Sequence, residues 1–177
     1  DNRKTLSYPE LRNFIKIELC RVIMENFTAP DAVAGVATGA IAQGALVADE
    51  LGLPYVYVRS TPKDHGLENL IEGTLKPGQK VVVIEDLVST GGSSLKAVEA
   101  IRNAGCEVVG MVAIFTYGFP VAVKRFNDAG VKLITLSNYN SMLEAAIDID
   151  YIKNEDLETL KEWRKDPANW VHKSQAD

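Results

Sequence analysis

Residues 81–93 read VVVIEDLVSTGGS. The β-branched run at their start is typical of a strand buried on both faces of a sheet, and we predict this strand at residues 80–84. A helix is expected soon after it, since Leu95, Val98 and Ile101 recur at helical spacing. A buried strand followed directly by a helix indicates a parallel sheet with helices packed against it.

The same alternation of strands and helices continues along the rest of the chain. We therefore predict an α/β fold in which one domain, residues 1–177, is built on a twisted parallel sheet flanked by helices on both faces. Ser7 and Glu10 have the spacing of a capping box at the start of the first helix. The remaining strands are predicted at 32–36, 55–58, 108–115 and 132–136, and the remaining helices at about 8–27, 41–51, 121–129, 141–147 and 154–165.

The composition argues against several classes of protein. Hydrophobic residues make up 46% and charged residues 24%, as in a globular domain rather than a disordered chain. The net charge of −5 argues against a general nucleic-acid or membrane-surface binder, which would present a basic face. No apolar stretch is long enough to cross a bilayer. Two cysteines are too few for a disulfide framework or a zinc cluster, so the cytoplasm is the expected compartment.

Residues 85–93 form a predicted anion site where the strand meets the helix. Glycines let the backbone approach a phosphate, and the start of a helix offers free N–H groups. Glu85 and Asp86 would be repelled by a phosphate alone, so we expect them to bind sugar hydroxyls or a divalent metal beside it. The site therefore suits a phosphorylated sugar. The simpler alternative is an ordinary turn, with Ser93 or Ser94 as the helix N-cap and both acids solvated.

Residues 81–93 resemble, at every position, the signature of type I phosphoribosyltransferases for 5-phosphoribosyl 1-diphosphate (PRPP). The resemblance implies the fold of that family. It also implies that Ser89 to Ser93 wrap the 5′-phosphate, that Glu85 and Asp86 hold the ribose hydroxyls, and that Mg²⁺, held mainly by PRPP, bridges the sugar and the diphosphate. The implied PRPP-binding residues of this motif are Glu85, Asp86, Leu87, Val88, Ser89, Thr90, Gly91, Gly92 and Ser93.

A second polar segment, residues 59–78, separates two predicted strands and begins with a cluster of cations. Arg59, Lys63 and His65 lie within seven residues of one another. A flexible cationic loop suits a diphosphate leaving group, because cations that close over it stabilise the charge that builds up as the bond breaks. The alternative is a solvated surface loop without a catalytic role.

Residues 59–66, RSTPKDHG, resemble the catalytic loop of orotate phosphoribosyltransferases. The resemblance implies a homodimer in which this loop reaches PRPP in the neighbouring subunit. Arg59, Lys63 and His65 would then contact PRPP, with Lys63 as the main catalytic residue. His65 and Asp86 complete the set of catalytic residues that we expect.

The segment GVATGAIA, residues 35–42, lies where that family has its diphosphate loop. Thr38 and Gly39 are the expected contacts, because small residues let backbone amides face an anion at the start of the next helix. Taken alone, this pattern is also compatible with ordinary helix–strand packing.

Three features depart from the family pattern. Residues 1–4, DNRK, are neither an initiator methionine nor a signal peptide, so we expect that a short segment with base-binding contacts precedes them. Ser60 stands where many members have a second lysine, so one diphosphate contact is expected to be absent or replaced. Residues 115–118, FTYG, replace an Asp-Arg pair whose arginine grips the orotate carboxylate, and Ser89 is then the nearest expected contact to orotate.

The combined patterns resemble an orotate phosphoribosyltransferase, a glycosyltransferase of the pentosyltransferase class. Such an enzyme transfers the phosphoribosyl group of PRPP to orotate in pyrimidine synthesis and needs no nucleic acid or membrane. Two alternatives remain open: a phosphoribosyltransferase for another base, and a PRPP-sensing regulator that has lost catalysis. The Lys63–His65 cluster argues against both, and the net charge of −5 argues against a DNA-binding regulator.

Overall fold

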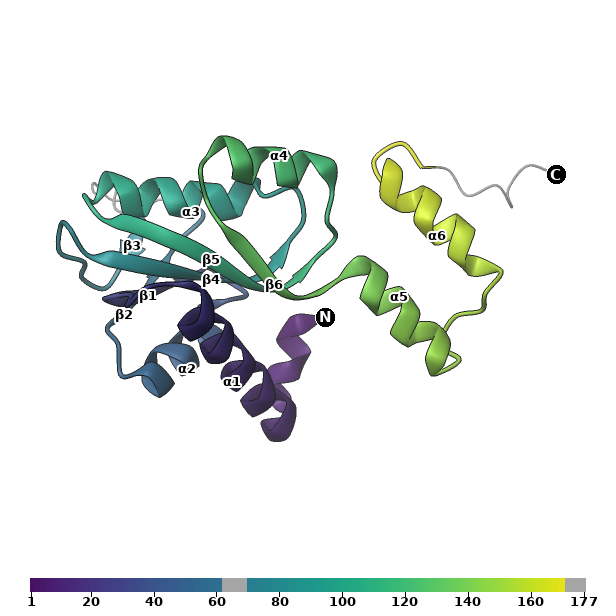
Figure 1. The fold of residues 1–177 in the computed structure, drawn as a ribbon, viewed down its shortest axis with the longest axis horizontal. Helices are drawn as coiled ribbons and strands as arrows, with labels where there is room; N and C mark the ends of the chain where they lie inside the picture. Colours follow the sequence, from purple (N-terminus) through teal and green to yellow (C-terminus); the bar gives the residue numbers. More distant parts are fainter. Residues whose placement is uncertain (62–69, 171–177) are drawn as a thin grey trace.

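The computed structural model describes residues 1–61 and 70–170, which fold around a six-stranded sheet (Figure 1). Its strands are β1 Ala32–Val36, β2 Tyr55–Val58, β3 Ile71–Glu72, β4 Lys80–Val88, β5 Glu107–Thr116 and β6 Leu133–Asn138. They lie in the order β3-β2-β1-β4-β5-β6. Neighbouring strands pair in parallel, except that β3 runs antiparallel to β2. The two-residue β3 was not predicted, because a strand that short has no readable period.

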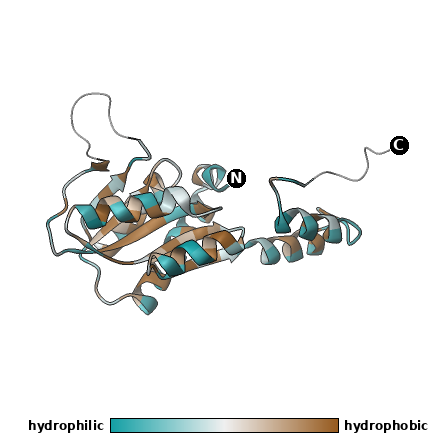
Figure 2. Cartoon of the chain, turned by 90° about the horizontal axis from the view of Figure 1, so that it is seen from above, coloured by the Kyte–Doolittle hydropathy of each residue, from teal (hydrophilic) through white to brown (hydrophobic). Residues whose placement is uncertain are grey.

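Helices cover both faces of the sheet, as predicted. They are the 3-10 helix η1 Asn2–Ser7 and the α-helices α1 Pro9–Asn26, α2 Ile41–Leu51, α3 Gly92–Asn103, α4 Pro120–Asp128, α5 Tyr139–Asp148 and α6 Asp156–Lys165. Helices α3 and α4 pack on one face, and α1 and α2 pack on the other (Figure 1). Helices α5 and α6 continue beyond β6, away from the sheet (Figures 1 and 2). Within residues 1–61 and 70–170, no helix is both long and apolar enough to span a membrane.

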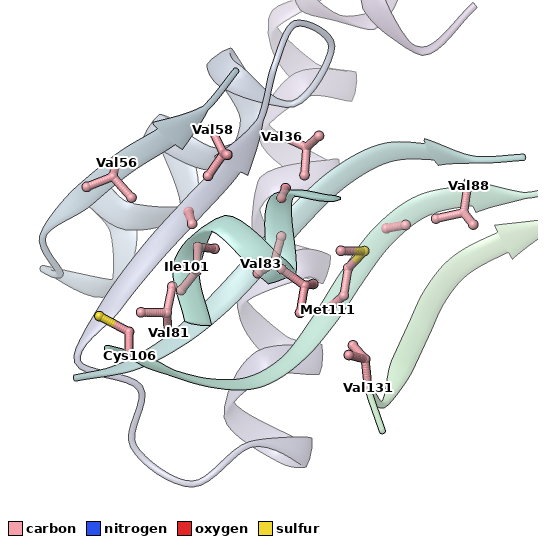
Figure 3. Close-up of a cluster of buried hydrophobic side chains, with 14 of the residues drawn as sticks. Val36, Val56, Val58, Val81, Val83, Val88, Ile101, Cys106, Met111 and Val131 are labelled. Carbon is pink, nitrogen blue, oxygen red and sulfur yellow. The ribbon is translucent and has the colours of Figure 1, made fainter. Parts of the chain in front are cut away.

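Strand β4 lies at the centre of the core because its side chains are buried on both faces. Val81 and Val83 pack toward α3 and α4 in the cluster shown in Figure 3. Val82 and Ile84 belong to the cluster that faces α1 and α2. Successive side chains of a strand point to opposite faces, so a strand covered on both sides must be apolar at every position. This explains the uninterrupted run from which the fold was predicted.

The prediction that β4 ends at residue 84 is wrong. The strand continues to Val88 because β5 remains beside it, with Glu85 paired to Ala113 and Leu87 paired to Phe115. Glu85 and Asp86 therefore belong to a strand rather than to a loop. Since strands hold their side chains more rigidly than loops do, this changes the environment of both acids.

The predicted capping box at Ser7 is wrong, and the structure also differs from the alternative in which Ser93 or Ser94 caps the next helix. Helix α1 has Tyr8 as its N-cap without a side-chain hydrogen bond, because Ser7 is the last residue of η1. Helix α3 has Gly91 as its N-cap, with φ of 79°. Ser93 therefore lies inside α3, and the alternative in which it caps an ordinary turn does not hold.

Candidate active site

The carboxyl ends of β1 and β4 lie side by side, because these strands pair in parallel with Gly35 opposite Ile84. In open parallel sheets, ligands bind beyond such strand ends. A polar cavity of about 260 Å³ opens there. Its lining brings together the predicted diphosphate loop and the predicted PRPP motif: Arg3, Val36, Ala37, Thr38, Gly39, Glu85, Asp86, Leu87 and Ser93.

Larger cavities, of about 660 and 620 Å³, lie around α5 and α6. Their linings are mainly apolar and include none of the residues predicted to bind PRPP or orotate. Size alone is therefore a poor guide to the site in this chain. The smaller cavity is the candidate active site because polar groups from several parts of the sequence converge on it.

Gly39 is required by a close approach across this cavity. A Cβ atom at Gly39 would overlap the carboxylate of Asp86. The loop after β1 therefore lies directly against the Asp86 side chain, and a residue larger than glycine at position 39 would require the carboxylate to move. This contact supports the expectation that the predicted diphosphate loop and the acidic residues belong to one site. The sequence indicated this only because both segments follow predicted strands.

Glu85 is almost fully buried, with 4% of its surface exposed. Its Oε1 accepts a hydrogen bond from the Asp86 N–H at 2.9 Å, and its Oε2 accepts one from the Ser94 hydroxyl at 2.8 Å. Burial, together with the adjacent Asp86 carboxyl, raises the pKa of Glu85 to about 8. Glu85 is therefore protonated at neutral pH, and the acidic pair repels a phosphate less than two carboxylates would.

The turn between β4 and α3 is built to expose backbone N–H groups. Gly91 has φ of 79°, and a Cβ atom there would lie 2.9 Å from the ring of Phe126. Arg125 of α4 donates a hydrogen bond from Nη1 to the carbonyl oxygen of Thr90 at 3.0 Å. The first turn of α3 has N–H groups without partners in the helix, as an anion site requires.

The cationic loop is only partly described. Lys63 and His65 lie outside the described residues, so their roles remain predictions. Arg59 directly follows β2, and its N–H donates to the carbonyl oxygen of Leu70 at 2.8 Å. Its guanidinium lies 3.5 Å from Glu72 of β3 and is not part of the cavity lining. Arg59 thus lies at the edge of the sheet where the carboxyl ends of β1 and β2 meet, but its PRPP contact also remains a prediction.

Three side chains at or near the site were not predicted as functional. Arg3 lines the cavity, Ser94 holds Glu85, and Arg164 of α6 reaches the turn after β5. There Arg164 donates to the carbonyl oxygens of Tyr117 at 2.7 Å and Gly118 at 2.9 Å. Arg164 is 47 residues from Tyr117, so no local pattern could have identified it, whereas Ser94 is only nine residues from Glu85.

Comparison with known proteins agrees with this geometry. Residues 14–149 match the phosphoribosyl transferase domain family. The chain is 70% identical over 170 residues to an orotate phosphoribosyltransferase of Phocaeicola vulgatus, covering 96% of this chain and 80% of that protein. A protein of the same name from Bacteroides thetaiotaomicron is 71% identical over the same shares of both chains.

Solved structures show the same relationship. The crystal structure of orotate phosphoribosyltransferase from Aeropyrum pernix matches with a TM-score of 0.76 and 29% identity, covering 86% of this chain and 84% of that one. Leishmania donovani UMP synthase matches with a TM-score of 0.79 and 26% identity, covering 93% of this chain and 35% of that one. The predicted PRPP motif and the predicted diphosphate loop line one cavity, as these matches lead us to expect. The matches show that the chain belongs to the orotate phosphoribosyltransferase family and has the type I phosphoribosyltransferase fold.

Proposed function

We propose that this chain transfers the 5-phosphoribosyl group of PRPP to orotate, giving orotidine 5′-phosphate and diphosphate in the pathway to UMP. The observation that carries the proposal is the shared cavity of Gly39 and Asp86, in a chain 70% identical to a protein named for this activity. In the reaction, a bond forms between N1 of orotate and the anomeric carbon of PRPP. The bond from that carbon to the diphosphate oxygen breaks, and the diphosphate leaves with the bonding electrons.

Residues in and next to the cavity are proposed to bind different parts of PRPP. Ser89 to Ser93 and the free N–H groups of α3 hold the 5′-phosphate, while Asp86 holds the ribose hydroxyls. The Asp86 carboxylate also stabilises positive charge that develops on the ribose ring as the diphosphate departs. Binding energy from the distant 5′-phosphate orients the reacting carbon, because rigid anchoring replaces a chance encounter. Ser89 is the proposed contact to the base.

Arg59, Lys63 and His65 are the proposed cations for the leaving diphosphate. Their support is the spacing of residues 59–66 and the position of Arg59 after β2, next to β1. We also propose that the loop acts across a homodimer. Exposed hydrophobic side chains on α1 support an interface, since Phe14 is 62% exposed and Met24 is 67% exposed.

Magnesium is the proposed cofactor, and the described residues suit an ion carried by the substrate. Within the described part of the chain, no group of three or more potential ligand side chains forms a metal cage. Both oxygens of Glu85 already accept hydrogen bonds, which leaves Asp86 as the carboxylate of the cavity that is available to an ion. Mg²⁺ is commonly held by one or two carboxylates together with substrate phosphates. When bound, it would supply positive charge that neutralises the diphosphate.

The cytoplasm is the proposed compartment. Cys20 and Cys106 are both free and buried, which is compatible with a reducing environment.

The direct test is to incubate the protein with PRPP, Mg²⁺ and one base at a time. Orotate consumption, followed by absorbance, and diphosphate release should both occur. Uracil, adenine and hypoxanthine should give at most trace release. Release with a purine and none with orotate would favour a different base specificity. The absence of turnover with every base, while PRPP still binds, would favour a PRPP-sensing regulator instead.

A further inference from the structure

Arg3 lines the cavity, although it belongs to none of the predicted binding segments. It belongs to η1, at the start of the described chain, yet it lines the cavity together with Gly39, Asp86 and Ser93. These residues come from the loop after β1, the end of β4 and the start of α3. Arg3 is therefore a fourth component of the candidate active site.

Hydrogen bonds hold η1 in this position. Asn2 donates from Nδ2 to the carbonyl oxygen of Asp86 at 2.6 Å, which ties η1 directly to the end of β4. At the other end of η1, Arg12 of α1 donates to the carbonyl oxygen of Leu6 at 2.8 Å. Because both ends of this short helix are anchored, the approach of Arg3 to the cavity follows from the packing of η1 rather than from a loose chain end.

Arg3 is the basic side chain among the described residues that line the cavity. Among the described residues that line it, the other ionisable groups are Glu85 and Asp86, both acids. PRPP is a polyanion, and the Asp86 carboxylate repels it even when Glu85 is protonated. Arg59, the nearest predicted cation that the structure describes, is not in the lining and lies 3.5 Å from Glu72. Arg3 is thus the described side chain that can balance the charge of the substrate.

A guanidinium is well suited to this position. It is planar, stays charged at any physiological pH, and can donate two parallel hydrogen bonds to phosphate oxygens. Thr38 and Gly39, which lie in the same lining, offer small side chains and backbone groups toward the same space. The diphosphate is the part of PRPP expected at that loop, whose residues Thr38 and Gly39 line the cavity together with Arg3.

We propose that Arg3 is a substrate-binding residue that contacts the diphosphate group of PRPP. This inference rests on the proposed function, because it takes PRPP as the substrate. It adds to the diphosphate site a contact from η1, alongside the loop at Thr38–Gly39 and the cationic loop.

The test compares Arg3→Gln with Lys4→Gln. Lys4 is the next residue of η1, is exposed, and does not line the cavity, so both changes remove one positive charge from the same helix. Inorganic diphosphate binding in the presence of Mg²⁺ is measured by calorimetry, and KM values for PRPP and orotate are measured by turnover. Thermal unfolding verifies that both variants fold.

We expect Arg3→Gln to weaken diphosphate binding and to raise the KM for PRPP by at least about tenfold, the usual size of one lost charge-assisted hydrogen bond. Lys4→Gln should change either value by no more than about twofold. Equal effects of the two variants would overturn the proposal, and so would an increase in the KM for orotate alone. If the unmodified protein does not turn over orotate, the proposed function fails, whereas the diphosphate titration still decides the role of Arg3.

Discussion

Replacing Glu85 with glutamine should remove most of the pH dependence of folding stability between pH 5 and pH 8. Glu85 is buried in β4, and burial raises its pKa from 4.5 to about 8. Glutamine has nearly the same shape and stays neutral at every pH. Its amide oxygen can accept the hydrogen bond from the Asp86 N–H while its amide N–H donates to the Ser94 hydroxyl. The variant therefore isolates the proton of Glu85 from its packing.

The sign and size follow from proton linkage. Above pH 5, the unfolded chain releases the proton of Glu85, whereas the folded chain keeps it until the pH approaches 8. Folding stability therefore falls as the pH rises through this window. At about 1.4 kcal/mol per pKa unit, the free energy of unfolding attributable to Glu85 should fall by about 3 kcal/mol from pH 5 to pH 8.

The measurement is urea unfolding of the unmodified chain and of Glu85→Gln at pH 5, 6, 7 and 8. The matched control is Glu99→Gln, which removes the same charge from an exposed position on α3. The free energy of unfolding of the unmodified chain, minus that of Glu85→Gln, should fall by about 3 kcal/mol from pH 5 to pH 8. The difference for Glu99→Gln should stay constant. A constant difference for both variants would refute the conclusion that Glu85 is protonated at neutral pH.

Three further predictions concern activity and assembly. Gly39→Ala should lower kcat/KM for PRPP on the order of 100-fold, because its Cβ displaces the Asp86 carboxylate; unchanged kinetics would show that the loop moves aside without cost. Lys63→Ala should lower kcat far more than it weakens PRPP binding, and unchanged turnover would exclude Lys63 from catalysis. Phe14→Glu should shift the protein from dimer to monomer in light scattering, since it replaces an exposed hydrophobic side chain of α1 with a charge, whereas the same mass for both proteins would remove α1 from the interface.

Most of the fold could be predicted from local patterns. The run at Val81–Val83 is apolar at every position, and only a strand covered on both faces requires this. The glycines of the motif were expected to let the backbone approach a phosphate, whereas the role of Gly91 as a helix N-cap with φ of 79° came from the structure. The residues of a phosphate cradle are adjacent in the chain, so the PRPP motif could also be read without a structure.

Other features of the site depend on contacts between distant segments. Glu85 lies in a buried strand because β5 continues to pair with β4, and that pairing sets its pKa. Arg3 reaches the cavity because Asn2 is bonded to the backbone of Asp86, 84 residues away. The chain order thus specifies which residues can form a strand, a turn or a phosphate loop, since these depend on near neighbours. Burial, protonation and convergence on one cavity depend on which segments pack together, and no local sequence pattern records that.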